Sequence, residues 1–71
     1  MVSRVAENTR RIIAEKGFKQ KAVAARAGIP AGSFSAMMNN RKVIRDVDII
    51  SIANALSVTP NELFGFGPES A

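Results

Sequence analysis

Helix-terminating residues divide this chain into short segments and limit its fold more than any other feature. Gly17 and Gly28 accept the left-handed backbone conformation that ends a helix, and the pair Asn39 and Asn40 accepts it next most readily. Pro30 disfavours a helical conformation in the residue before it, but it can itself open a new helix. The helices of this chain are therefore predicted to be short and separated by tight turns.

Apolar residues recur with helical spacing between these terminators. In residues 3–16, one helical face holds Val5, Thr9, Ile12 and Ile13. Residues 19–27, rich in Ala, and residues 30–39 predict a second and a third short helix. We expect each of these helices to bury one face in a shared core.

The second half of the chain predicts two more helices. Asp46 starts the fourth, whose inner stripe is formed by Ile49, Ile52, Ala53 and Leu56. Thr59, Pro60 and Glu62 form a capping box with proline at the first helical position, which predicts a fifth helix carrying Leu63 and Phe64. The chain is thus predicted to be all-α, a single five-helix domain over residues 1–71, with its core at about 3–65 and a frayed tail at 66–71.

The composition excludes several functional classes. The chain has no Cys and no His, so we expect no disulfide, structural metal or cofactor, and no nucleophile-base pair of an enzyme. No apolar run is long enough for a signal peptide or a membrane span, which predicts a cytoplasmic protein without a membrane partner.

Charge is distributed unevenly along the chain. All ten Lys and Arg residues lie in residues 1–45, opposed there only by Glu7 and Glu15, which gives this part a net charge of +8. Residues 46–71 contain four acidic residues and no basic one. The basic part is predicted to face a polyanion, and the acidic part to make another contact, such as one with a second subunit. A solvated surface with chance clustering of charge is the alternative.

The spacing after Gln20 matches a helix-turn-helix unit. Counted from Gln20, the fifth place needs a small residue where two helices cross and holds Ala24, and the ninth needs a positive φ and holds Gly28. The apolar places four, eight, ten, fifteen and eighteen are occupied by Val23, Ala27, Ile29, Phe34 and Met37. A generic helical hairpin is the alternative, and the flanking helices favour the helix-turn-helix.

With these flanks, the chain resembles the lambda-repressor-like family, the Cro/C1 or XRE-type helix-turn-helix domains of phage repressors and bacterial regulators. The resemblance extends from Val5 to Gly65, and it depends on the segments 15–20, 27–30, 39–42, 52–56 and 58–64. It implies a DNA-binding domain whose third helix enters the major groove.

The resemblance also implies which residues contact DNA. The candidates for facing base edges are Pro30, Ala31, Gly32, Ser33, Ser35, Ala36 and Asn39. The candidates for contacting phosphates are Lys19, Gln20, Lys21, Asn40, Arg41 and Lys42, because amides at a helix start and nearby cations attract phosphate. A solvated loop is the alternative for Arg41 and Lys42.

The chain departs from this family in two places. The family often has a long polar side chain at the start of its recognition helix, but Ala31, Gly32 and Ala36 have no donor to offer. Readout is therefore predicted to depend on thymine methyls, serine hydroxyls and DNA shape. An Arg–Glu ion pair of many members corresponds to Ile13 and Met38, which we expect to form an apolar core contact instead.

These features predict a sequence-specific transcriptional regulator, a repressor or Cro-like operator binder of phage or bacterial origin. We expect a homodimer on a palindromic site in double-stranded DNA, with its subunit contact near Leu63, Phe64 and Phe66. The alternative is an antitoxin or adaptor of the same fold that uses Phe64 and Phe66 to bind another protein.

Overall fold

The computed structural model describes residues 3–66, and these residues form five helices and no strand. The helices are α1 (Arg4–Lys16), α2 (Gln20–Ala27), α3 (Ala31–Met38), α4 (Asp46–Leu56) and α5 (Pro60–Leu63). The predicted all-α class is confirmed, and each predicted helix is present with its ends shifted by a residue at most. The tail predicted for 66–71 lies, after Phe66, outside the described residues.

Each described helix is followed, one or two positions after its last residue, by a residue with positive φ. These residues are Gly17, Gly28, Asn40, Ser57 and Gly65. In every case the amide of the next residue donates to the carbonyl five positions back, over 2.8–3.1 Å. This bond satisfies a carbonyl that a helix end leaves unpaired, and it reverses the chain sharply enough to pack short helices together.

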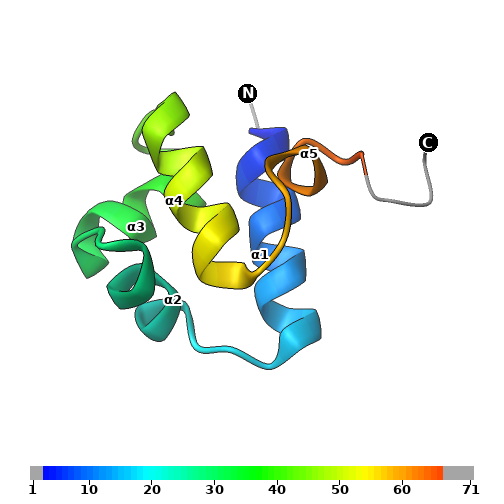
Figure 1. Cartoon of the computed structure of the whole chain (residues 1–71). Coiled ribbons are helices and arrows are strands. Elements are labelled where there is room, and N and C mark those ends of the chain that lie inside the picture. The colour runs from blue at the N-terminus through cyan, green and yellow to red at the C-terminus, as the bar shows by residue number, and fades with distance from the viewer. Residues whose placement is uncertain (1–2, 67–71) are drawn as a thin grey trace.

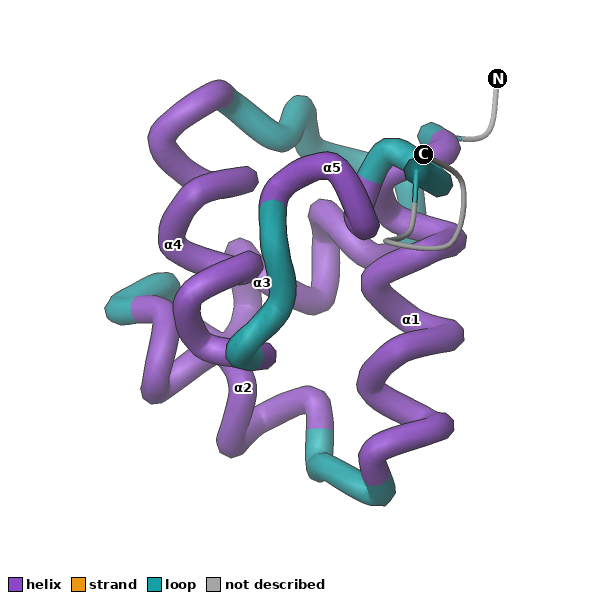
Figure 2. The backbone as a smooth tube through the Cα atoms, turned by 45° about the vertical axis from the view of Figure 1, so that its right-hand side comes forward, coloured by secondary structure: helices purple, strands orange, loops and turns teal. Residues whose placement is uncertain are grey.

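The helices pack against α1 and α4. Helix α4 contacts α2, α5 and α1, and α1 also contacts α3 and α5. Figure 1 shows α4 between α3 on one side and α1 with α5 on the other. Figure 2 shows α5 closing the gap between α4 and α1. The helix-turn-helix unit, α2 and α3, therefore rests on a scaffold of the other three helices.

Apolar side chains from all five helices fill the core. The largest fully buried side chains are Phe34, Met38, Ile52, Leu56, Leu63, Val23 and Thr9. The predicted inner stripe of α4 is buried throughout. Ile13 and Met38 are both buried, as expected of a core contact that replaces an ion pair.

Leu63 corrects the predicted subunit contact. Its side chain is 0% exposed, so it belongs to the core of its own chain and cannot meet a second subunit. Phe64 and Phe66 are 40% and 61% exposed, so neither side chain is buried in the core. Of the three residues, only these two phenylalanines are available for a contact.

Candidate nucleic-acid interface

The turn between α2 and α3 has the geometry that the sequence spacing predicts. Gly28 has a φ of 72°, and the amide of Ile29 donates to the carbonyl of Ala24 over 3.0 Å. Ala24 is 1% exposed, which leaves no room for a larger side chain where α2 packs. Ala27 and Ile29 are partly buried against the core, and Val23, Phe34 and Met37 lie within it.

The inner face of α3 fixes which of its residues point outward. Phe34, Met37 and Met38 are buried, so the opposite face of this helix is directed to solvent. All the residues predicted to face bases lie outside the core: Pro30, Ala31, Gly32 and Asn39 are exposed, and Ser33, Ser35 and Ala36 are half-buried. Pro30 precedes the helix as its N-cap instead of forming its first turn.

Two polar side chains fold onto this outer face. The Asn39 amide donates through Nδ2 to the carbonyl of Ser35 over 2.9 Å and to the Ser35 hydroxyl over 3.4 Å. The Lys42 ammonium donates to the Ser33 hydroxyl over 3.1 Å. Both serines that the sequence offers for base contacts are therefore already paired with a neighbouring side chain.

The residues predicted to contact phosphates lie in two places. Lys19, Gln20 and Lys21 are exposed at the start of α2, where unpaired amides and the helix dipole favour an anion. Arg41 and Lys42 are exposed just after α3. Positive charge thus flanks the helix-turn-helix unit at the start of α2 and after α3.

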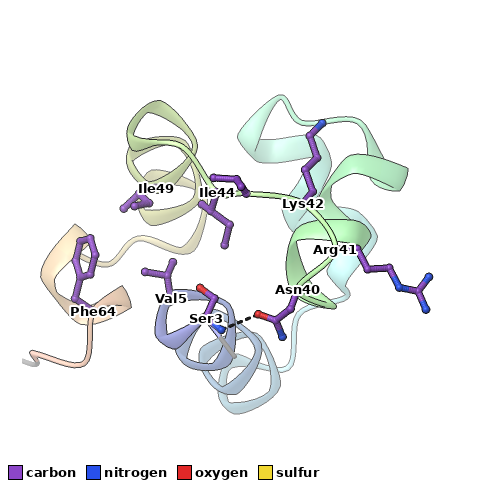
Figure 3. A pocket seen from close by; sticks show the side chains of 9 residues that line it. Ser3, Val5, Asn40, Arg41, Lys42, Ile44, Ile49 and Phe64 are labelled. Carbon is purple, nitrogen blue, oxygen red and sulfur yellow. Dashed lines mark hydrogen bonds between the residues drawn. The ribbon is translucent and has the colours of Figure 1, made fainter. Parts of the chain in front are cut away.

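Asn40 ends α3 as the sequence predicts, and its side chain has a further structural role that the sequence did not reveal. Its backbone is left-handed, with a φ of 61°, and its Oδ1 accepts from the backbone amide of Ser3 over 2.7 Å. Figure 3 shows this bond joining the end of α3 to the start of α1. The side chain of Asn40 therefore holds the first residue of the loop, leaving only its amide nitrogen for a phosphate.

The other end of the loop is held by an ion pair that sequence reasoning missed. The Asp48 carboxylate is 5% exposed, and it accepts from Arg45 through the backbone amide at 3.0 Å, Nε at 3.2 Å and Nη2 at 3.4 Å. Hydrogen bonds from the Arg45 side chain lower the pKa of Asp48, although burial opposes them, and the charge of Lys42 adds to the lowering. The sequence signal for this pair was Asp48, an acidic residue three positions after the N-cap as in a capping box. It was missed because the N-cap itself is Arg45, and basic residues are unusual at that position.

The loop between these anchors borders an open groove of about 470 Å³. Its floor is apolar, with Val5, Ile44, Ile49 and Phe64, as Figure 3 shows. Within residues 3–66, no helix is long and apolar enough to cross a bilayer, and no cluster of acidic side chains could hold a metal ion.

A tightly turned pair of short helices, whose second helix has its outer face outside the core and cationic segments on either side of the pair, is the geometry of a helix-turn-helix protein. The sequence model of the Cro/C1-type helix-turn-helix DNA-binding domain matches residues 8–69. The chain belongs to this family, whose members are DNA-binding transcriptional regulators.

The fold also has a counterpart among solved structures. The restriction-modification controller protein C.AhdI from Aeromonas hydrophila superimposes with a TM-score of 0.81 and 24% sequence identity, over 86% of this chain and 92% of that one. Comparison with curated protein sequences gives no match. The likeness to C.AhdI supports the all-helical fold over most of the chain.

Proposed function

We propose that this chain is a sequence-specific operator-binding regulator, a repressor or Cro-like binder that acts on double-stranded DNA in the cytoplasm of a bacterium or its phage. The observation that supports this function best is the outer face of α3, which lies outside the core and has cationic segments before and after it. The function is that of a binding module instead of an enzyme, since a chain without His or Cys lacks the usual catalytic groups.

In this proposal, α3 lies in the major groove with its first turn nearest the base edges. Lys19, Gln20 and Lys21 contact the phosphates on one side of the groove, and Arg41 contacts those on the other, with the Asn40 amide beside it. Phosphate contacts position the protein without reading sequence, and they release counterions. Binding should therefore weaken steeply as salt is raised.

Selection of bound duplexes from a random library, followed by titration of the selected and scrambled duplexes, tests this function. We expect an enriched motif, bound about 10³-fold or more tighter than scrambled DNA. Lys21→Ala should weaken both duplexes alike and reduce the slope of log K against log salt by about one unit. Arg10→Ala removes the same charge from α1, outside the helix-turn-helix, and should have little effect. A library that returns no motif would exclude the function.

A two-fold dimer on a palindromic operator is part of the proposal. Its half-sites would lie one helical turn apart, about 34 Å. Large apolar side chains available for the subunit contact are Val47 and Ile50 on α4, at 59% and 53% exposure, together with Phe64 and Phe66. Analytical ultracentrifugation with and without the selected duplex would detect the dimer. A single monomer bound to one half-site would refute this part of the proposal.

The exposure of Phe64 and Phe66 also favours a second function, that of an antitoxin or adaptor that binds another protein. The double substitution Phe64→Ser with Phe66→Ser separates the two functions. If these residues bind a different protein, regulation in cells is lost although the purified variant keeps its DNA affinity and its oligomeric state. If they form the dimer, DNA affinity and dimerisation fall together.

A further inference from the structure

The recognition helix has no long polar side chain of its own to read a base. Ala31 and Ala36 end in methyl groups and Gly32 has no side chain, while the longer apolar residues of α3 are buried. Discrimination of guanine or adenine by paired hydrogen bonds needs a side chain that can make two hydrogen bonds at once. Such a side chain must reach this face from a neighbouring segment.

Lys42 is placed to bring such a side chain to the outer face of α3. It follows α3 in the loop, yet its Nζ lies 3.1 Å from the hydroxyl of Ser33, in the first turn of the helix. This turn is the part of a recognition helix that approaches the base edges. An ammonium group has three protons, so the bond to Ser33 leaves two for O6 and N7 of a guanine.

The loop holds Lys42 at this position from both ends. Asn40 is tied to Ser3 before it, and Arg45 is tied to the buried Asp48 after it. Arg41 is exposed in the same loop, and Figure 3 shows its side chain leaving in a different direction from that of Lys42. The two neighbouring cations are therefore placed for different tasks.

We propose that Lys42 determines specificity by reading a guanine in the major groove opposite Ser33, and that Ser33 positions its ammonium group. Lys42 is then a base-reading residue and not the phosphate contact that its sequence suggests. Arg41 keeps the phosphate role. This inference rests on the proposed function, because it requires α3 to lie in the groove.

The experiment compares Lys42→Ala with Arg41→Ala, a matched loss of one positive charge from the adjacent exposed position. Each variant is titrated against the selected operator, every single-base variant of one half-site, and a scrambled duplex, by fluorescence anisotropy at fixed salt. Lys42→Ala should reduce the preference for G·C at one base pair by roughly 5- to 150-fold, leaving the other preferences intact. Arg41→Ala should weaken all duplexes by the same factor.

Ser33→Ala tests the positioning role. It should weaken the preference at the same base pair as Lys42→Ala, and the double variant should lose no more than Lys42→Ala alone, because the two residues act as a unit. Additive losses would refute the coupling.

A uniform loss for Lys42→Ala, like that of Arg41→Ala, would overturn the inference while the operator function stands. If the unmodified protein does not distinguish the operator from scrambled DNA, the proposed function fails, and the inference fails with it.

Discussion

Replacing Thr9 with valine should stabilise the protein. The Thr9 side chain is fully buried on the inner face of α1, and its hydroxyl has no hydrogen-bond partner within residues 3–66. A buried hydroxyl without a partner costs about 1–3 kcal/mol. Valine has nearly the same shape and the same stiffness at χ1, and its extra methyl group adds apolar burial. We therefore expect Thr9→Val to raise the free energy of unfolding by about 1–2 kcal/mol.

Urea titrations and thermal melts followed by circular dichroism would measure this change. For a domain of this size, each kcal/mol corresponds to a rise of about 4–8 °C in Tm. Thr9→Ser is the control, since it keeps the hydroxyl and removes the methyl, and it should destabilise by about 0.5–1.5 kcal/mol. All variants need the same protein concentration, because a dimer makes Tm concentration-dependent. A Thr9→Val variant as unstable as the serine variant would show that the hydroxyl is bonded after all, as threonines in helices often are to a preceding carbonyl.

Four further substitutions probe other parts of the structure. The pKa of Asp48 is lowered from 3.8 in the folded chain, so its stabilising contribution is complete above that pH and is lost as pH falls through the folded value. Asp48→Asn should therefore destabilise the protein at neutral pH and flatten the acid limb of stability against pH in urea titrations, and an unchanged limb would contradict the pairing with Arg45. Gly32→Ala should raise Tm, because its new Cβ meets nothing within 4 Å on a helix, whereas Gly65→Ala should lower Tm because Gly65 has a φ of +95°; equal shifts would refute this contrast. If Ile50, 53% exposed on α4, lies in the subunit contact of the proposed dimer, Ile50→Asp should convert that dimer to a monomer in sedimentation without loss of helical signal. An intact dimer would exclude this residue from the contact.

Local signals in the sequence were sufficient to predict most of the fold. Gly17, Gly28 and Asn40 end helices because their backbones adopt positive φ cheaply. The Glu62 carboxylate accepts from the Thr59 amide over 2.8 Å, as its spacing in the capping box predicts. These signals involve residues a few positions apart, so neither requires knowledge of the tertiary structure.

Features that depend on tertiary structure could not be predicted in this way. Ser57 ends α4 with a φ of 58°, although serine has little preference for that conformation, because α5 must turn back onto α1. The position of Leu63 in the core likewise depends on packing between helices distant in sequence. The residues that the sequence proposed for DNA contact all lie outside the core. The hydrogen bond from Lys42 to Ser33, nine residues away, could not be predicted, because it depends on the path of the loop after α3.

In the proposed function, the residues that stabilise α3 are separate from the residues that face DNA. The inner face of α3 is buried through Phe34, Met37 and Met38, and the left-handed residue Asn40 fixes its end. Its outer face contributes little to the core, because Ala31 and Gly32 are exposed and have at most a methyl group to bury. Substitutions on that face would change the side chains that α3 offers to DNA. They would not create cavities or bury charges, which are the usual causes of large losses in stability. In the proposed complex, a helix with so few long polar side chains on its outer face leaves base discrimination to side chains from the flanking segments and to the shape of the DNA, so the conformation of the loop after α3 would help to determine specificity.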